Sequence, residues 1–311
     1  MEQQTRRPDT ASEDSAAPEG SLPRVAVMTM ARDEGEMLRR WVAYYGREVG
    51  ETNLLLLDDN STDGSTDDLP CTVLRIPQGP YKIPWERVRK QLANGLARGL
   101  LACYDFVMFA DTDEFLVPDP EKYAGLRAYL ASAGDRRAIA PVAVNLLHAT
   151  DLEPDLAQGA PVLEQRRFVK FVPGMCKPLI KRVSADWGVA FHSIKVPFEI
   201  DPDLLMVHLK YCDVSSAQRT AEERFRAHTK EGRGGLLSAW AVPPEDLAER
   251  VRKWARHPPG KPVELFDPGQ QSLHKIIRIK ENGHFRSRGG QLEAMDKNPL
   301  RQLPAKYRGL F

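Results

Sequence analysis

Short apolar runs alternate with stretches of helical periodicity through the first half of this chain, and this alternation restricts its possible folds. Residues 54–57 are four consecutive leucines, so the corresponding strand offers no polar face to water. Strands that are apolar on both faces are typical of parallel sheets covered by helices. The runs that we interpret as strands are residues 25–30, 54–57, 72–76, 106–110 and 138–144. The sequence therefore predicts an α/β fold with a doubly wound, mostly parallel sheet flanked by helices.

Two helices are predicted among these strands. The first is expected to begin near Asp33 and Glu36, whose spacing is that of a capping box. It continues with apolar residues at helical intervals as far as Tyr45. The second covers residues 85–102, where apolar residues recur three or four positions apart and form one stripe of a helix.

The chain length of 311 residues suits one large α/β domain with an appendage. Residues 1–22 are rich in Ser, Ala, Glu, Asp and Pro, a composition that predicts a disordered tail. We expect the main domain to cover residues 23–215. Residues 216–311 are expected to form a basic, helical C-terminal extension, with helices near residues 217–231 and 244–256.

Composition and charge indicate which partners and compartment to expect. No apolar run reaches the roughly 20 residues that a membrane span needs, and residues 1–22 lack the apolar core of a secretory signal. The four cysteines are scattered, with no pair at metal-binding spacing. With a net charge of +1, no global field attracts nucleic acid. We therefore expect a cytoplasmic protein with no nucleic-acid partner and at most peripheral membrane contact.

Three carboxylates follow the apolar run 106–110 directly, in the sequence Asp111-Thr112-Asp113-Glu114. Ligands of open α/β sheets bind beyond the carboxyl ends of the strands. Carboxylates this close together repel one another and lose hydration when they are buried, and a cation relieves both effects. Oxygen ligands favour Mg²⁺ or Mn²⁺, which are usually shared with substrate phosphates. The alternative interpretation is a solvated acidic turn.

A second polar cluster covers residues 58–65, at the end of another predicted strand. Its carboxylates, Asp58 and Asp59 among them, are suited to accept hydrogen bonds from a nucleobase or from ribose hydroxyls. The same composition is also that of a turn, because Asp, Asn, Ser and Gly form turns for local reasons.

Taken together, three motifs resemble glycosyltransferase family 2. Residues 27–34 (VMTMARDE) are similar to the family's first-strand motif, and residues 58–65 (DDNSTDGS) are similar to its second-strand motif. Residues 111–116 (DTDEFL) look like the Asp-x-Asp-Glu-Phe signature of a branch related to glycosyltransferase family 92. The resemblance covers roughly residues 24–212.

The resemblance implies a GT-A fold, a nucleotide-diphosphate sugar donor, most often a UDP-sugar, and a divalent metal, Mn²⁺ or Mg²⁺. By this analogy Arg32, Asp58 and Asp59 lie near the nucleoside. Asp111 faces the ribose or the metal, and Asp113 ligates the metal. Family members usually invert the anomeric centre, with a carboxylate base on the acceptor hydroxyl.

Later segments resemble further blocks of the same branch. The resemblance makes His208 the candidate for a third metal ligand and gives His192 a possible functional role. Lys177 and Lys210 are candidates to pair with diphosphate oxygens. A histidine in an apolar stretch is also a common hydrogen-bonded core residue.

The chain departs from the family at the general base. No Glu-Asp or Asp-Asp pair occurs between residues 144 and 191, where the family commonly carries one. The single candidates are Asp151, Glu164 and Asp186. We favour Asp186, because the adjacent Trp187 is suited to stack on a sugar and burial can raise a carboxyl pKa toward the range of a base. Further aromatic candidates for the acceptor site are Tyr81 and Trp85.

The expected function is a metal-dependent hexosyltransferase that acts on a glycan, a glycolipid or a small-molecule hydroxyl acceptor. A first alternative is a catalytically silent carbohydrate- or partner-binding module with the same fold. A second is a sugar nucleotidyltransferase, although residues 31–34 are acidic where such enzymes need a glycine-rich, basic loop. A nucleic-acid binder that uses the basic C-terminal segment is disfavoured by the near-zero net charge.

Overall fold

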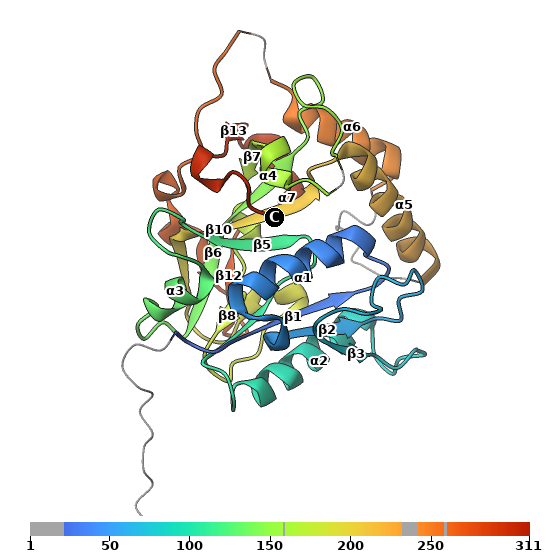
Figure 1. The fold of residues 1–311 in the computed structure, drawn as a ribbon, viewed down its shortest axis with the longest axis vertical. Helices are drawn as coiled ribbons and strands as arrows, with labels where there is room; N and C mark the ends of the chain where they lie inside the picture. Colours follow the sequence, from blue (N-terminus) through green and yellow to red (C-terminus); the bar gives the residue numbers. More distant parts are fainter. Residues whose placement is uncertain (1–21, 158, 232–241, 258–259) are drawn as a thin grey trace, which may run out of the picture.

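The structure is a computed structural model that describes residues 22–157, 159–231, 242–257 and 260–311 (Figure 1). The predicted tail at residues 1–22 falls outside this range except for its last residue. The described residues form a ten-stranded sheet covered by helices, together with a small three-stranded sheet. The predicted α/β architecture with a sheet flanked by helices is confirmed.

The first half of the chain builds a parallel part of the large sheet in the order β4-β1-β2-β3. Its elements are β1 (Val25–Ala31), α1 (Gly35–Val49), β2 (Leu54–Asp58), β3 (Thr72–Arg75), α2 (Trp85–Leu100) and β4 (Phe106–Phe109). All four predicted strands and both predicted helices of this region are confirmed. Because Ala31 pairs with Asp58 and Met28 with Phe109, β1, β2 and β4 all end at one edge of the sheet.

The start of α1 differs from the predicted capping box. Glu34 occupies the N-cap position, and no side chain caps the helix. Asp33 instead has a left-handed backbone, with φ of 54°. Its carboxylate accepts hydrogen bonds from the backbone N–H groups of Thr62 at 2.6 Å and Asp63 at 3.2 Å. The loop after β2 thus supplies the donors that attract Asp33, and the loops after β1 and β2 are joined.

The second half of the sheet mixes parallel and antiparallel pairs. Its strands are β5 (Glu114–Pro118), β6 (Ala138–Leu147), β7 (Phe168–Phe171), β8 (Ile180–Lys181), β10 (Glu199–Tyr211) and β13 (Arg301–Gln302). Strand β10 runs parallel to β6 and antiparallel to β5, and β7 and β8 are antiparallel to β6. Of these strands only β6 was predicted. The register places His208 opposite both Glu114 and Asn145, so β10 meets the acidic motif.

The C-terminal region contains strands as well as helices. Helices α5 (Val214–Glu231) and α6 (Pro244–Ala255) agree with the two predicted helices, and α7 (Gln291–Lys297) follows later. Strands β11 (Ile277–Ile279) and β12 (Phe285–Ser287) form the small sheet with β9 (Ser193–Ile194). The chain then returns to the core, where the Phe311 ring stacks on Phe115 at 4.3 Å.

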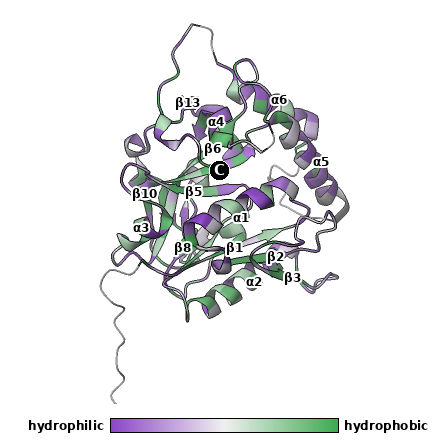
Figure 2. Ribbon diagram, viewed as in Figure 1, coloured by the Kyte–Doolittle hydropathy of each residue, from purple (hydrophilic) through white to green (hydrophobic). Residues whose placement is uncertain are grey.

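The strands of the large sheet carry most of the buried apolar residues, and helix α1 packs on one face of the sheet (Figure 2). Helix α1 buries Trp41, Tyr44 and Tyr45 against the sheet. The hydroxyl of Tyr44 donates to the Leu116 carbonyl at 2.7 Å, and that of Tyr45 donates to the Glu114 carbonyl at 2.8 Å. These bonds hold β5, and with it the acidic motif, against α1. No helix among the described residues is long and apolar enough to cross a membrane.

Candidate active site

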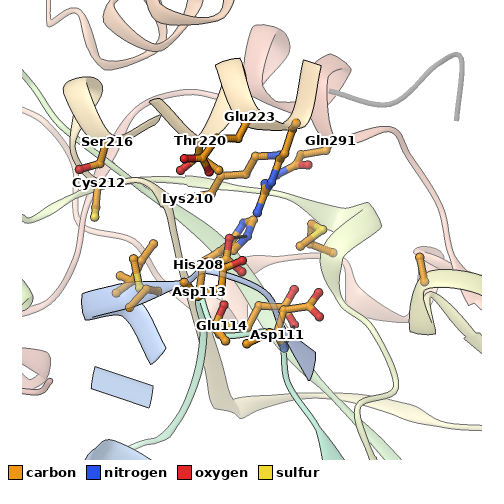
Figure 3. Close-up of a pocket in the computed structure, with 18 of the residues that line it drawn as sticks. Asp111, Asp113, Glu114, His208, Lys210, Cys212, Ser216, Thr220, Glu223 and Gln291 are labelled. Atoms are coloured by element: carbon orange, nitrogen blue, oxygen red, sulfur yellow. Dashed lines mark hydrogen bonds and ion pairs between the residues drawn. The ribbon is translucent and has the colours of Figure 1, made fainter. Parts of the chain in front are cut away.

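A cavity of about 1320 Å³ opens at the edge of the sheet where β1 and β4 end (Figure 3). Helix α5 and the start of α7 contribute the other walls. The cavity collects most of the predicted site residues: Arg32, Asp59, Trp85, Asp111, Asp113, Lys177, His192, His208 and Lys210. Asp58 and Asp186 are not among the residues that line it.

Asp113 and His208 form a buried pair at the floor of the cavity. Asp113 Oδ2 lies 3.2 Å from His208 Nε2. On the other side of the ring, His208 Nδ1 lies 2.6 Å from Asn145 Oδ1. An amide oxygen only accepts hydrogen bonds, so Nδ1 carries the proton that is donated to Asn145. The imidazole is thereby oriented with Nε2 toward the carboxylate.

Several cations keep Asp113 ionised. Burial by itself would raise the pKa of this carboxyl. The charge and the hydrogen bond of His208, with the charges of Arg224 and Lys210, outweigh burial and hold the pKa well below its usual range. Asp113 therefore offers an anionic carboxylate to the cavity at every physiological pH.

Asp111 points to different partners. Its carboxylate pairs with the guanidinium of Arg89 and lies 3.5 Å from Lys177 Nζ. Burial would raise the pKa of Asp111, but the charges of Arg89 and Lys177 lower it. Lys177 also binds the Glu114 carboxylate. The structure thus joins two of the three predicted metal ligands, Asp113 and His208, and holds Asp111 in an ion-pair network beside them.

Helix α5 brings a cation that the sequence did not single out. Arg224 lines the cavity and acts electrostatically on both Lys210 and Glu34. Burial and the Arg224 charge lower the pKa of Lys210 to about 7, although Asp113 and Asp111 oppose the change. Burial raises the pKa of Glu34 to about 7, with Arg224 opposing and Asp113 reinforcing the rise.

The residues predicted to contact the nucleoside divide into two groups. Arg32 and Asp59 line the cavity. Asp58 is fully buried and accepts hydrogen bonds from Arg75 Nε at 2.9 Å and from the Ser61 backbone at 2.7 Å. Asp58 therefore holds the loop after β2 and does not face the cavity. The polar loop acts partly as the turn that its composition also predicted.

The predicted aromatic residues lie beside this loop. The hydroxyl of Tyr81 donates to Asp59 Oδ1 at 3.4 Å. The rings of Tyr81 and Trp85 pack together with centroids 4.9 Å apart. Of the two, Trp85 lines the cavity.

The structure does not bring Asp186, the predicted general base, to the cavity. The side chain of Asp186 is 47% exposed and pairs with Arg98 at 2.7 Å, in a separate surface depression. The neighbouring Trp187 is buried, and its indole N–H donates to the Pro178 carbonyl at 2.6 Å. Neither side chain can therefore act on a ligand bound beside Asp113.

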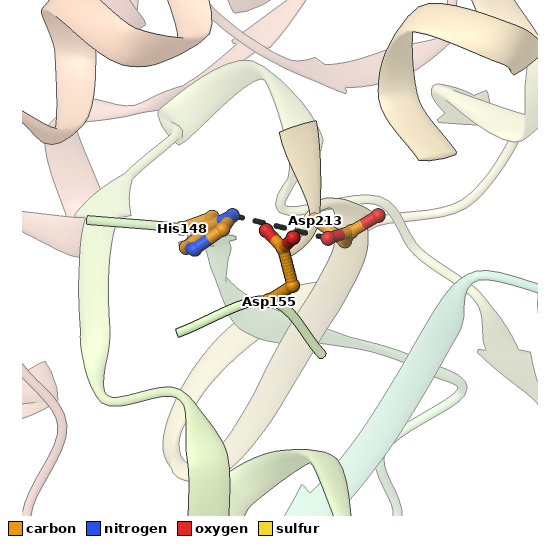
Figure 4. Close-up of side chains that lie close together, drawn as sticks. All are labelled: His148, Asp155 and Asp213. Carbon is orange, nitrogen blue, oxygen red and sulfur yellow. Dashed lines mark ion pairs between the residues drawn. The ribbon is translucent and has the colours of Figure 1, made fainter. Parts of the chain in front are cut away.

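A second cluster of histidine and carboxylates lies at the start of α5 (Figure 4). The candidate ligand atoms of His148, Asp155 and Asp213 all lie within 4.8 Å of one another. Asp213 accepts a hydrogen bond from the Ser216 backbone at 2.8 Å, as a helix-capping residue does. Its other oxygen lies 3.8 Å from His148 Nδ1, and His148 Nε2 donates to the Glu153 carbonyl at 3.1 Å. The cluster therefore ties α5 to the loop after β6.

Comparison with known proteins gives distant likenesses. No family model and no curated protein matches the chain. Mannosyltransferase PcManGT from Pyrobaculum calidifontis, solved in complex with GDP-Man and Mn²⁺, is 15% identical over 78% of this chain and 74% of its own, with a TM-score of 0.36.

Glucosyl-3-phosphoglycerate synthase from Mycobacterium tuberculosis, solved with Mn²⁺, UDP and glucosyl-3-phosphoglycerate, is 20% identical. That match covers 39% of this chain and 44% of the synthase, with a TM-score of 0.27. The chain therefore spans less than half the length of the synthase. With TM-scores this low, neither likeness identifies the residues of the site.

Proposed function

We propose that this protein is a metal-dependent glycosyltransferase that moves a hexosyl group from a nucleotide-diphosphate sugar to a hydroxyl acceptor, with UDP as the expected nucleotide of the donor. The observation that carries the proposal is the Asp113–His208 pair, 3.2 Å apart at the carboxyl ends of the strands. A GT-A arrangement, the family 2 motifs and inversion of the anomeric centre belong to the same proposal.

The residues of the pair fit a divalent cation. A carboxylate oxygen and an imidazole nitrogen are ligands that Mn²⁺ accepts. The bond from His208 Nδ1–H to Asn145 turns Nε2 toward Asp113, as in sites where a partner orients a ligating histidine. A bound metal would take the place of a proton on Nε2. Two protein ligands leave coordination positions for diphosphate oxygens. When bound, the metal would neutralise charge on the leaving diphosphate.

Cations around the pair suit a diphosphate. Lys177, Lys210, Arg89 and Arg224 all line the cavity. In this structure Arg89 and Lys177 neutralise Asp111, and both cations border the cavity, where their N–H groups can also donate to phosphate oxygens. The nucleoside would then lie toward Arg32 and Asp59, at the ends of β1 and β2.

The size of the cavity suits two substrates. Its volume of about 1320 Å³ exceeds the roughly 300–1000 Å³ of ordinary small-molecule pockets. For an inverting reaction, a carboxylate must take the proton of the acceptor hydroxyl. Glu34 is our candidate, because it lines the cavity and its pKa is raised to about 7, near the working pH of a general base.

The first test measures nucleotide binding through the shift in melting temperature that it causes. Wild type, Asp113→Asn and the control Asp135→Asn, which changes an exposed aspartate, are heated with UDP, GDP or dTDP, with and without Mn²⁺. At about 100 times Kd, a ligand adds about 2.7 kcal/mol of stability, which raises the melting temperature. We expect one nucleotide to raise it in wild type and Asp135→Asn only with Mn²⁺, and Asp113→Asn to lose the effect.

Absence of a shift with every nucleotide would contradict the proposal. A metal-dependent shift without any donor hydrolysis or transfer would instead support the catalytically silent binding module. Hydrolysis of the matching nucleotide sugar in the absence of acceptor separates these two outcomes.

A further inference from the structure

The turn that precedes His192 has an unusual backbone. Ala190 and Phe191 both have left-handed φ angles, 52° and 59°, in the 3₁₀ turn Val189–Phe191. Neither is a glycine, so this conformation persists only where the surroundings enforce it. Val189, Ala190 and His192 line the cavity. Strained segments of this kind are concentrated at ligand sites.

Packing against the acidic motif enforces the conformation of this turn. The Phe191 ring stacks on Phe109 of β4, with centroids 3.9 Å apart. The guanidinium of Arg89 lies over the Phe191 ring at 5.0 Å and over the Phe109 ring at 5.4 Å. The same guanidinium pairs with Asp111. These contacts therefore hold His192, the next residue, at a defined position relative to Asp111.

A hydrogen bond determines which nitrogen of His192 is available. Nδ1 lies 2.9 Å from the Gly174 carbonyl oxygen. A carbonyl only accepts, so Nδ1 carries the proton and Nε2 keeps its lone pair. Gly174 packs directly against the Gly289 backbone, where a Cβ would come within 2.2 Å of the Gly289 carbonyl oxygen, so the position requires glycine.

The second nitrogen, Nε2, belongs to a side chain that lines the cavity. No described residue provides a hydrogen-bond partner for Nε2. Nε2 is also not one of the fully buried polar atoms that lack a partner among the described residues, so it is accessible to a ligand. The ring is also neutral, because burial and the nearby Lys177 charge lower the pKa of His192 to about 3, although the Gly174 bond opposes this. Nε2 is thus an uncharged acceptor open to a ligand.

The order of the strands places this acceptor relative to the expected donor. Strand β4 lies between β8 and β1 in the sheet. Gly174 and Lys177 lead into β8, whereas Arg32 and Asp59 follow β1 and β2. A donor with its nucleoside over β1 and β2 and its diphosphate at the acidic motif would extend its sugar toward β8 and His192.

We propose that His192 Nε2 accepts a hydrogen bond from a hydroxyl of the transferred sugar, so that the turn and His192 form the glycosyl subsite. This inference rests on the proposed function. A lone-pair acceptor matches a hydroxyl and rejects a carboxylate or carbonyl oxygen at the same position. The subsite therefore favours donors with a free neutral hydroxyl there.

Two substitutions of His192 distinguish the roles of its two ring nitrogens. An Asn side chain can keep the Nδ1 bond to Gly174 but places nothing at Nε2, whereas Gln can place an acceptor near Nε2. Calorimetric titrations with Mn²⁺ compare UDP with UDP-glucose and UDP-galactose, and GDP with GDP-mannose, for wild type, His192→Asn and His192→Gln. His274→Asn, at an exposed histidine, is the matched control.

We expect His192→Asn to weaken binding of the matching nucleotide sugar about three- to tenfold, which corresponds to the loss of one hydrogen bond. The affinity for the nucleotide without its sugar should not change. His192→Gln should retain most of the affinity for the nucleotide sugar, and the control all of it. A donor deoxygenated at the position that is read should bind wild type as weakly as the intact donor binds His192→Asn.

Equal affinities of wild type and His192→Asn for the nucleotide sugar would overturn the subsite, as would equal losses for nucleotide and nucleotide sugar. If His192→Asn does not fold, the series of deoxy donors on wild type decides alone, and a series without any loss overturns the subsite. Failure of wild type to bind any nucleotide would overturn the proposed function, and the subsite with it.

Discussion

Asn145 determines how His208 presents its ring to Asp113. It lies on β6 opposite His208, is fully buried, and accepts the Nδ1 proton at 2.6 Å. The carboxylate and the imidazole are visible in the sequence as candidates, but their partner is not. Asn145 is a polar residue within an apolar strand, and its role depends on the pairing of β10 with β6, which the sequence does not show.

The first prediction at the scale of residues concerns Asn145. Asn145→Leu keeps the approximate volume but removes the acceptor, so the His208 ring loses its orientation. We expect Mn²⁺ affinity to fall about 10- to 100-fold, as is typical when the partner of a ligating histidine is removed. Mn²⁺ titration in the presence of saturating nucleotide measures it. Unchanged affinity would show that His208 does not ligate the metal.

The second residue-scale prediction concerns pH. Burial raises the pKa of Glu34 from 4.5 to about 7, so between these values the native state binds a proton that the unfolded chain releases. Glu34 therefore stabilises the fold below pH 4.5, and this stability is lost as the pH rises toward 7. A shift of this size corresponds to roughly 3 kcal/mol.

Glu34→Gln should remove this loss. Urea unfolding in EDTA at pH 4.5 and pH 8 should show the variant gaining stability relative to wild type at the higher pH. A difference between variant and wild type that is the same at both pH values would contradict the raised pKa.

At the scale of elements, helix α5 forms one wall of the cavity, and its first turn is held by a capping side chain. Asp213 caps the helix through the Ser216 N–H and also faces His148. The opposite side of the cavity is held by β4 and β5. A weakened start of α5 would therefore change the position of Arg224 without changing Asp113.

We expect Asp213→Ala to destabilise the protein by about 1 kcal/mol, the usual cost of losing a capping side chain. Nucleotide affinity should fall as well, because Arg224 is less well placed. Asp246→Ala, in the first turn of α6 and outside the cavity lining, is the comparison. The prediction fails if both variants have the same melting temperature and the same nucleotide affinity.

At the scale of the whole molecule, the C-terminal segment closes the core of the main domain. Phe311 stacks on Phe115, contacts Tyr44 with ring centroids 5.2 Å apart, and its carbonyl accepts from the Val162 N–H at 2.6 Å. β13 also pairs with β7 in the large sheet. The proposed extension at residues 216–311 is thus joined to the main domain by packing and by strand pairing.

We expect Phe311→Ala to lower the free energy of unfolding by roughly 3 kcal/mol, as truncation of a buried aromatic ring does. Leu265→Ala, at a leucine that is 61% exposed, should change it by less than about 0.5 kcal/mol. Chemical denaturation measures both. Similar small effects in the two variants would show that Phe311 contributes little to the core.

The uniformly apolar strands were the easiest part of the fold to predict. Residues 25–30, 54–57 and 106–110 could be predicted as strands because consecutive apolar residues indicate burial on both faces. Strands β5, β7 and β8 were missed because they are short or lie directly against a motif that we interpreted only for its charges. Their pairing depends on residues far away in the chain.

The sequence by itself determined the α/β class, the main strands and helices of the first half, and the acidic motif at a strand end. These features arise from local periodicity and from the chemistry of neighbouring residues. Only the tertiary structure decided that His208 faces Asp113, that Arg89 and Lys177 engage Asp111, and that Asp186 lies away from the cavity. The physical reason is that side-chain partners across a sheet depend on strand order and register, which no local pattern specifies.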